Sequence, residues 1–594
     1  MEGAEAAAKR GAREWLRGPA LDLYEHLEAT GQIARLKQMP QLGAVTWVHP
    51  EIKHTRWDYV ELLLRLATCV DRVESLSHDM GELEIEGHAV GTARDLLQCW
   101  AMLQNCGHLW GTFATERLVL DALVEPGRAR DLFIRGMTTQ ADREFAEHVL
   151  GNYLLFKVNW ALAVGFLHTL PQHQSPAGRP IWLAMLRAYR NFGGNDTRTR
   201  RLYLGQRRLR RLAYTHLDLV NAALPVVTDL DAFERGPADQ LESFLSRRDD
   251  PFNAVLEHVR RYIPGEIYYA PDAVLVHRLL ELHAGAEMKR ELTAAASPQD
   301  LFAQLEAMKR EEAWPVVRQV VKAFRRGDYV HLHRIGWPRP ASMDKDSWHA
   351  TVHPVQSQVE RELGAGSLIQ VNVPNDRTER WCDFYVRRDI KPADLARTLA
   401  VICDSMMRPP AAAERFPAPQ PCQGAQVRDL VSAVLSLMLR DSKRVRVKES
   451  SELAGASSFL LVHSRNDGYV QREIERLRLA CTEDPRRHEL DVLDTALLAE
   501  PARGFRAVML GGFEVERRSE NSPGDAEFDG AYIDVETSGA RLHLVEAKST
   551  LNSHAAMRQL RRRLRRLGWS EGSQVVSIEG GAEATVPLRL LGRG

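Results

Sequence analysis

The sequence lacks the features that mark several specialised classes of protein. It has only seven cysteines in 594 residues, with no CxxC pair among them, so it predicts neither a disulfide framework nor a zinc ribbon. No apolar run approaches the length of about 20 residues that crosses a bilayer. The first 18 residues also lack the apolar core of a signal peptide. We therefore expect a cytoplasmic protein without a membrane partner.

The chain has no excess of either charge, because 79 lysines and arginines balance 79 aspartates and glutamates. Any surface that binds nucleic acid must then be a local patch. The hydrophobic fraction of 44% is that of an ordinary globular protein. A chain of this length exceeds a single core, so about two to four domains are expected.

Hydrophobic periodicity predicts a multidomain α and α/β protein. Residues 1–345 are expected to form an all-α domain, and residues 346–407 a small α+β segment packed on it. The Pro- and Ala-rich stretch 408–425 is typical of a linker. Residues 426–594 predict an α/β domain. The clearest helical segments in the first domain are 58–72, 93–105, 116–125, 142–170 and 209–224.

The most specific chemistry lies near the C-terminus. Asp529 precedes an alternating stretch, and 17 residues later a predicted strand ends in Glu546-Ala547-Lys548. Successive strand residues face opposite sides, so Glu546 and Lys548 are expected to share one face while Ala547 points into the protein. Carboxylate oxygens suit a hard divalent cation, and a lysine beside them can orient or activate a water.

This arrangement resembles the PD-(D/E)XK nuclease superfamily, although the dipeptide PD itself is absent. The resemblance assigns Asp529 to the second motif and Glu546-x-Lys548 to the third. It implies a restriction-endonuclease-like domain with a mixed sheet, in which Asp529, Glu546 and the Ala547 carbonyl hold Mg²⁺ or Mn²⁺. Gln559 matches a glutamine that several branches carry after the lysine. The alternative is a hairpin with solvated charges.

The superfamily often adds a first-motif glutamate from a helix before the sheet. Glu489 is the first choice for that acid, with Glu473 and Glu475 behind it. Each of the three could instead be an ordinary solvated helix charge, because helices in globular proteins commonly carry such residues on their exposed faces.

An arginine-rich helix is expected directly after the third motif. Arg558, Arg562 and Arg566 lie on its predicted exposed face, where cations would hold the phosphodiester backbone in register. They are the candidate nucleic-acid-binding residues, and the alternative is a plain solvated face.

The N-terminal helices carry a second resemblance. Their segments KHTRWDY (53–59) and AMLQNCGHLWGTF (101–113) are similar to the two motifs of HD-domain phosphohydrolases, especially the dNTP triphosphohydrolase branch. The ligands differ from the family pattern, since Tyr59 replaces the first histidine and Gln104-Asn105 the His-Asp pair. Tyrosine has a pKa near 10, and amide oxygens seldom hold a transition metal.

We therefore expect an HD-like fold without metal hydrolysis, because Asp218, the candidate fourth ligand, cannot hold a metal alone. The pocket could still bind a nucleotide or a nucleic acid. The arginine-rich segment 187–211 favours phosphate binding, unless it is a solvated helix face. Chance similarity between amphipathic helices is the alternative to the whole resemblance.

Three functions remain open at this point. The first is a Mg²⁺-dependent DNA endonuclease that hydrolyses phosphodiester bonds, with the inactive HD-like domain as a sensor or binding module, as in phage-defence effectors. The second is a non-enzymatic nucleotide- or nucleic-acid-binding protein whose two enzyme-like domains are both inactive, and the third is an HD-type phosphohydrolase with atypical ligands. The nuclease is favoured because Asp529, Glu546 and Lys548 are all present. Whether the chain forms a homo-oligomer is left open.

Overall fold

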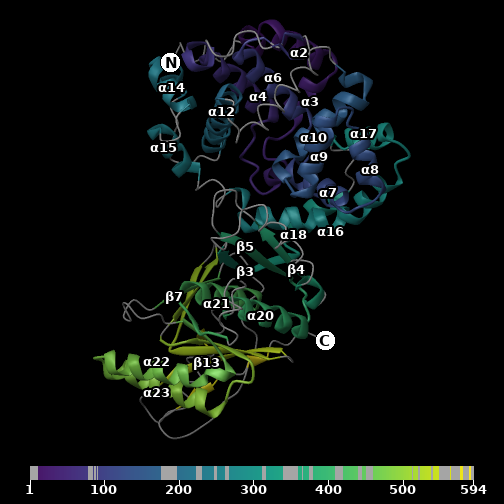
Figure 1. Cartoon of the computed structure of the whole chain (residues 1–594). Coiled ribbons are helices and arrows are strands. Elements are labelled where there is room, and N and C mark those ends of the chain that lie inside the picture. Colours follow the sequence, from purple (N-terminus) through teal and green to yellow (C-terminus); the bar gives the residue numbers. More distant parts are fainter. Residues whose placement is uncertain are drawn as a thin grey trace. The chain divides into compact units, whose positions relative to one another are not determined.

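A computed structural model gives the structure of the chain (Figure 1), which divides into two compact units, residues 1–322 and 323–594. The expected α and α/β layout is confirmed at this level. The residues that the structure describes are 11–77, 84–85, 88–89, 91–174, 197–221, 230–246, 250–260, 267–310, 316–338, 359–363, 366–372, 379–407, 419–438, 445–449, 459–511, 513–519, 522–536, 539–547, 562–563, 576–578 and 588–589.

In its described residues, the first unit is helical apart from the short hairpin β1 (Glu84–Ile85) and β2 (His88–Ala89). Its helices are α2 (Gly18–Ala29), α3 (Gln32–Gln38), α4 (Arg56–Ala67), α5 (Glu74–Ser77), α6 (Ala93–Cys106), α7 (Phe113–Val124), α8 (Arg128–Arg135), α9 (Gln140–Gly151), α10 (Leu155–Thr169), α12 (Thr197–Asn221), α13 (Leu230–Arg235), α14 (Ala238–Ser246), α15 (Pro251–Arg260), α16 (Pro271–Ala294) and α17 (Pro298–Ala307). Helix α18 (Val316–Arg326) spans the boundary between the units.

Capping boxes fix where α4 and α6 begin. The Thr55 hydroxyl accepts a hydrogen bond from the Asp58 backbone N–H, and the Asp58 carboxylate accepts one from the Thr55 N–H at 2.6 Å. Thr92 and Asp95 form the same reciprocal pair at α6. Such caps satisfy backbone donors that the first turn leaves unpaired. They therefore place Tyr59 in the first turns of α4.

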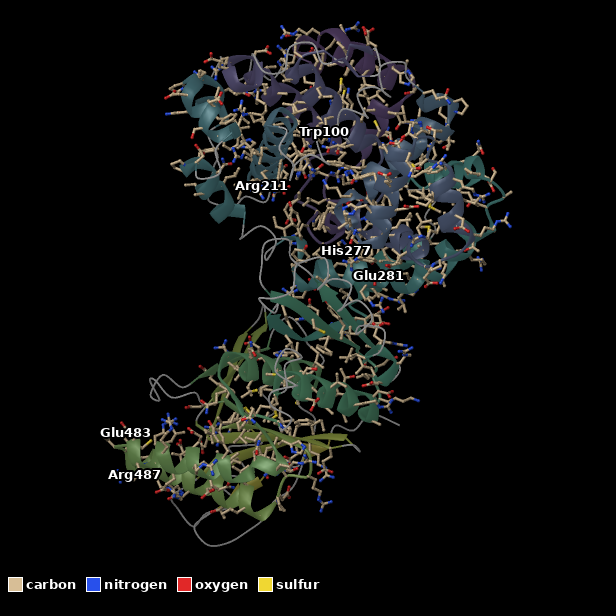
Figure 2. All side chains as sticks on the ribbon, viewed as in Figure 1. Trp100, Arg211, His277, Glu281, Glu483 and Arg487 are labelled. Carbon is tan, nitrogen blue, oxygen red and sulfur yellow. The ribbon has the colours of Figure 1, made fainter. Side chains whose placement is uncertain are left out.

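Close contacts tie α6 to α10. Trp100, which is fully buried among the helices of this unit (Figure 2), meets the ring of Trp160 edge-on at 5.6 Å. Gly107 follows α6 directly, and a Cβ atom there would lie 1.8 Å from the carbonyl oxygen of Asn159. The helical pattern predicted over 142–170 is interrupted between α9 and α10, where Tyr153 has a φ of 50°.

The second unit is built from helices and mostly antiparallel strands. Its elements are β3 (Tyr329–Pro338), β4 (Ser367–Asn372), β5 (Glu379–Arg387), α20 (Pro392–Met407), β6 (Cys422–Gln423), α21 (Ala425–Met438), β7 (Val445–Glu449), β8 (Phe459–His463), α22 (Asp467–Ala480), α23 (Asp484–Ala499), β9 (Phe505–Met509), β10 (Phe513–Ser519), β11 (Ser522–Phe528), β12 (Gly530–Glu536), β13 (Gly539–Ala547), β14 (Val576–Ile578) and β15 (Leu588–Arg589).

Three sheets organise these strands. The largest has the order β14-β13-β12-β9-β8-β6 with β15 on β13, and it is mixed because β13 and β14 run parallel while its other pairs are antiparallel. Helices α20 and α21 share one core with this sheet and with the small sheet β3-β5-β4. Helices α22 and α23 cover the opposite face of the large sheet (Figure 1).

The division of the chain differs from the sequence-based expectation in three places. The unit boundary falls at 322/323 and not at 345, because the strand 329–338 pairs with β5. The segment 346–407, expected to pack on the helical domain, supplies β4, β5 and α20, which join the core of the second unit. Residues 408–418 of the expected linker lie outside the described residues, and β6 at its end pairs with β8.

Within the described residues, no helix combines the length and the apolar character that a membrane crossing requires.

The tight α6–α10 contact generates a stability prediction. Gly107→Ala should lower the thermal unfolding midpoint, because its Cβ would collide with backbone atoms that cannot move aside, at a cost of roughly 1–3 kcal/mol. Gly205→Ala is the matched control, since Cβ in α12 would meet only Leu76 at 3.6 Å. That change should be neutral or stabilise by up to about 1 kcal/mol. Equal midpoints for both variants in scanning calorimetry would contradict the prediction.

Candidate functional site

Asp529 lies between two strands, where the chain passes from β11 to β12. The antiparallel register pairs Gly530 with Val545, so one further step brings Asp529 beside Glu546. The Asp529 carboxylate accepts a hydrogen bond of 2.6 Å from the backbone N–H of Ala547. The structure therefore brings Asp529 into direct contact with the tripeptide Glu546-Ala547-Lys548 through Ala547. The alternating stretch after Asp529 forms β12, and β11 ends just before this residue.

Glu489 approaches the same place from α23. This helix packs on the sheet through Leu490 and Leu493, which leaves Glu489 half-buried near the start of the helix. Its carboxylate accepts a hydrogen bond of 2.7 Å from Arg486. Burial raises the pKa of Glu489, the Arg486 guanidinium opposes this, and the neighbouring Asp529 raises the pKa further. Glu489 and Asp529 are thus close enough for their charges to interact.

The other two candidates for a first-motif acid lie on α22 and form ion pairs within that helix. Glu473 accepts from Arg476 at 2.8 Å, and Glu475 accepts from Arg478 at 2.6 Å. Such pairs three positions apart are common on helix surfaces.

The remaining nuclease candidates can be followed only in part. Glu546 pairs through its backbone with Ser577 of the parallel strand β14. Arg562 is exposed and lies in a helical segment. Four candidates lie outside the described residues, namely Lys548, Arg558, Gln559 and Arg566.

Two of the four HD-like positions meet on α12. The Tyr59 hydroxyl accepts a hydrogen bond from Arg210 at 3.3 Å, and the Gln104 side-chain oxygen accepts one from Gln206 at 3.2 Å. Gln206 and Arg210 lie one turn apart, so α12 brings Tyr59 and Gln104 together.

The other two HD-like positions have different partners. Asn105 donates to the carbonyl of Ala101 in its own helix at 2.7 Å. Asp218, fully buried, accepts a hydrogen bond from Tyr268 and lies 3.0 Å from His54 Nε2. Neither His54 nor Tyr268 was predicted from the sequence as a candidate site residue.

A buried histidine lies close to these positions. Asn159 donates to His108 Nε2 at 3.2 Å, so Nδ1 carries the proton and donates to Glu116 at 2.7 Å. Burial lowers the pKa of His108 to about 4, aided by Arg56 and opposed by Glu116. His108 is therefore neutral at pH 7, and both ring nitrogens are engaged.

Cations and aromatic rings gather beside this region. Lys157 Nζ lies 3.5 Å from the ring centre of Trp160 and 5.8 Å from that of Tyr203. Arg207 and Arg210 are near enough to lower the pKa of Lys157 in addition to the effect of burial. A small hollow between α4, α6 and α12 is lined by Gln104, Gln206 and Arg210 together with apolar side chains. An anionic group and a flat ring both suit such surroundings.

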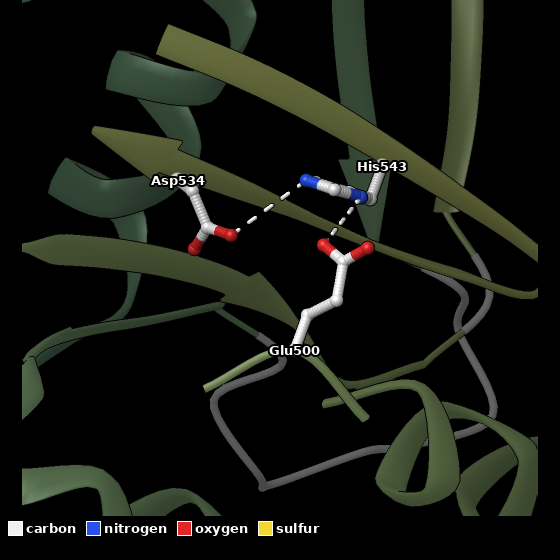
Figure 3. A group of neighbouring side chains, drawn as sticks. All are labelled: Glu500, Asp534 and His543. Carbon is white, nitrogen blue, oxygen red and sulfur yellow. Dashed lines mark ion pairs between the residues drawn. The ribbon is translucent and has the colours of Figure 1, made fainter. Parts of the chain in front are cut away.

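A third group of polar side chains was missed by sequence reasoning. Glu500, Asp534 and His543 meet on the face of the large sheet that α23 covers (Figure 3). Asp534 is bound by Arg506 through two hydrogen bonds of 2.5 and 2.8 Å. The alternation of β12 and β13 puts Asp534 and His543 on one face, but nothing local in the sequence indicates that Glu500 joins them.

Comparisons with known proteins add little to this geometry. No protein-family model matches the chain, and no curated protein matches it. Among solved structures, the chain is similar to a hypothetical protein from Aquifex aeolicus, at 12% identity over 63% of this chain and 93% of that chain, with a TM-score of 0.35. That score is too low to assign a fold, so function must be inferred from the residues themselves.

The neutral state of His108 makes the first unit sensitive to acid. The pKa of His108 is about 4 in the folded chain and 6.5 without burial. The stability that this neutral histidine contributes is therefore fully present above pH 6.5 and is lost as the pH falls towards 4. A shift of this size corresponds to about 3 kcal/mol. His108→Gln should make the pH dependence of the unfolding midpoint shallower over that interval. An unchanged dependence in calorimetric scans would contradict the assignment.

Proposed function

We propose that the chain is a metal-dependent DNA endonuclease whose site lies at the meeting point of β12, β13 and α23. The observation that carries the proposal is the hydrogen bond from Ala547 to Asp529, with the Glu489 carboxyl close to Asp529. Asp529, Glu546 and Lys548 act as the second and third motifs, and Glu489 as the first-motif acid. DNA is the substrate, and the reaction is hydrolysis of a phosphodiester bond.

The donor set suits Mg²⁺ or Mn²⁺. Asp529, Glu546 and Glu489 offer carboxylate oxygens and Ala547 a backbone carbonyl, which are the ligands that hard cations prefer. These residues would hold a divalent cation, which would supply Lewis-acid polarisation of the scissile phosphate and a lowered pKa for a bound water. Without a bound metal, the Arg486 guanidinium neutralises the charge of the Glu489 carboxylate. This ion pair therefore competes with metal binding by Glu489.

The remaining nuclease residues act on the substrate. Lys548 positions the attacking water and offsets the negative charge that develops on the phosphate. Gln559 belongs to the same site by resemblance to several branches of the superfamily. Arg558, Arg562 and Arg566 hold the DNA backbone without reading its sequence.

The first unit acts in this proposal as a nucleotide-sensing module. Arg207 and Arg210 supply positive charge for phosphate oxygens, and the ring of Tyr203 supplies a face on which a base can stack. Tyr59, Gln104 and Asn105 hydrogen-bond to neighbouring groups of the protein, which disfavours the alternative of a metal-dependent HD hydrolase. Fusions of a sensor with a nuclease resemble phage-defence effectors, and the cytoplasm is their expected location.

Plasmid cleavage tests the nuclease. Lys548→Ala should abolish Mg²⁺- or Mn²⁺-dependent cleavage while the metal still binds, because the lysine acts on the water and the phosphate. Asp529→Asn should abolish cleavage and weaken Mn²⁺ binding in calorimetry, because a charged ligand is lost. Glu527→Gln is the matched control, since this exposed glutamate lies beside the site.

The outcomes separate the competing functions. Cleavage by Lys548→Ala at the wild-type rate would make the site assignment wrong. DNA binding by the wild type without cleavage under either metal would favour the non-enzymatic alternative.

Nucleotide binding tests the role of the first unit. Arg210→Ala should weaken the binding of a nucleoside triphosphate by about 10–100-fold, because a charge-assisted contact contributes roughly 1.5–3 kcal/mol. The control is Arg290→Ala on α16, whose side chain is 75% exposed. Equal affinities for the two variants in isothermal titration, or no binding by the wild type, would exclude this module as the sensor.

A further inference from the structure

The group formed by Glu500, Asp534 and His543 is independent of the proposed nuclease site. His543 comes from the middle of β13, Asp534 from β12, and Glu500 from the residue that ends α23 (Figure 3). Asp534 is five positions along the chain from Asp529, which corresponds to about 16 Å in a strand. The two sites therefore cannot share one ion.

His543 lies within ion-pairing distance of Glu500 and Asp534 but forms no hydrogen bond with either. His543 Nδ1 lies 3.6 Å from Glu500, and Nε2 lies 3.6 Å from Asp534. Both distances exceed those of hydrogen bonds, and neither ring nitrogen has a hydrogen-bond partner among the described residues. The residue is only 1% exposed. Buried polar atoms are nearly always satisfied, so this imidazole indicates that a group is missing.

Tyr532 gives the same indication. Its ring stacks on His543 with a centroid distance of 4.2 Å and 8° between the planes. The residue is fully buried, and its hydroxyl also lacks a hydrogen-bond partner within the described part of the chain.

The spacing suits a metal ion better than a hydrogen bond. Zinc bonds to imidazole nitrogen and carboxylate oxygen are about 2.0–2.1 Å long, and tetrahedral angles then put two ligand atoms about 3.4 Å apart. The 3.6 Å between His543 Nε2 and Asp534 is close to that value, and an ion bound at this nitrogen leaves Nδ1 on the Glu500 side of the ring. One candidate ligand atom from each of the three residues lies within 4.8 Å of the others, so small side-chain shifts bring them onto one ion.

Arg506 provides the outer support that metal ligands usually have. Its two hydrogen bonds orient the Asp534 carboxylate, and it also donates to the backbone carbonyl of Glu500 at 2.5 Å. Metal-bound carboxylates are typically held by such outer partners. The charge balance agrees, because two carboxylates face a single guanidinium in this group. Glu500 is 32% exposed and gives an ion a route of entry.

We propose that Glu500, Asp534 and His543 bind one divalent transition-metal ion, for which Zn²⁺ is the best fit. One imidazole and two carboxylates are ligands that zinc accepts. The ion would join the end of α23 to β12 and β13, so its role is structural. It differs from the proposed Mg²⁺ site in ligands, in location and in its preference for a transition metal.

Zinc titration of the full chain tests the site. The protein is stripped with a chelator, and Zn²⁺ is returned in the presence of excess Mg²⁺, so that sites for hard cations are filled. The wild type should retain one zinc per chain and show the visible absorption of tetrahedral Co²⁺ when cobalt is supplied. Glu500→Gln should weaken zinc binding by about tenfold or more, and Arg506→Lys by about 10–100-fold, as for other outer partners of a metal.

Two controls keep the result specific. Asp529→Asn should leave the zinc content unchanged, which separates this site from the nuclease site. The metal-free Glu500→Gln protein should unfold at the same temperature as metal-free wild type, which shows that the variant is folded. Absence of stoichiometric zinc from the wild type, or equal zinc affinity of Glu500→Gln and wild type, would overturn the proposal.

Discussion

The antiparallel pairing of β12 with β13 is the constraint on which the second unit depends. Its register places Gly530 opposite Val545, which brings Asp529 to the backbone of Ala547. The same register places Tyr532 opposite His543. A slip of one residue would turn every side chain of one strand to the other face. Both polar groups in this unit would then be lost together with the core on each side of the sheet.

Helix α23 provides the second half of both groups. Eleven positions separate Glu489 from Glu500, which corresponds to about 16 Å along a helix. Five positions separate Asp529 from Asp534, which is also about 16 Å along a strand. The helix packs against β12 and β13, so it carries one acid towards each end of the hairpin. Arg506 holds its last turn through hydrogen bonds to the Leu497 and Glu500 carbonyls.

Local patterns were enough to predict much of the secondary structure. The apolar periodicity of 58–72 and 93–105 predicts α4 and α6, and the strand expected to end at Glu546-Ala547-Lys548 is β13. Pairing between distant segments could not be predicted in this way. The strand 329–338 belongs to the second unit because it pairs with β5, some fifty residues later. The expected helix is interrupted at Tyr153, whose backbone has a left-handed conformation. No residue pattern in the sequence predicts that conformation.

The candidate sites show the same limit. Asp529 and the Glu546-x-Lys548 motif are close in sequence, so their approach follows from a single hairpin. Glu489 was selected from three helix acids by resemblance, and only the packing of α23 separates it from Glu473 and Glu475. No sequence pattern identifies Glu500 as a site residue, because Asp534 and His543 come near it only once the sheet has formed.

Hydrogen bonds between side chains join the helices around the N-terminal polar group. Tyr59 joins α4 to α12 through Arg210, and Gln104 joins α6 to α12 through Gln206. These bonds are buried or nearly so, and leaving such groups unpaired would cost about 1–3 kcal/mol each. Tyr59 and Gln104 therefore hold α12 against α4 and α6. That arrangement keeps Arg207 and Arg210 beside Lys157, as the proposed sensing role requires.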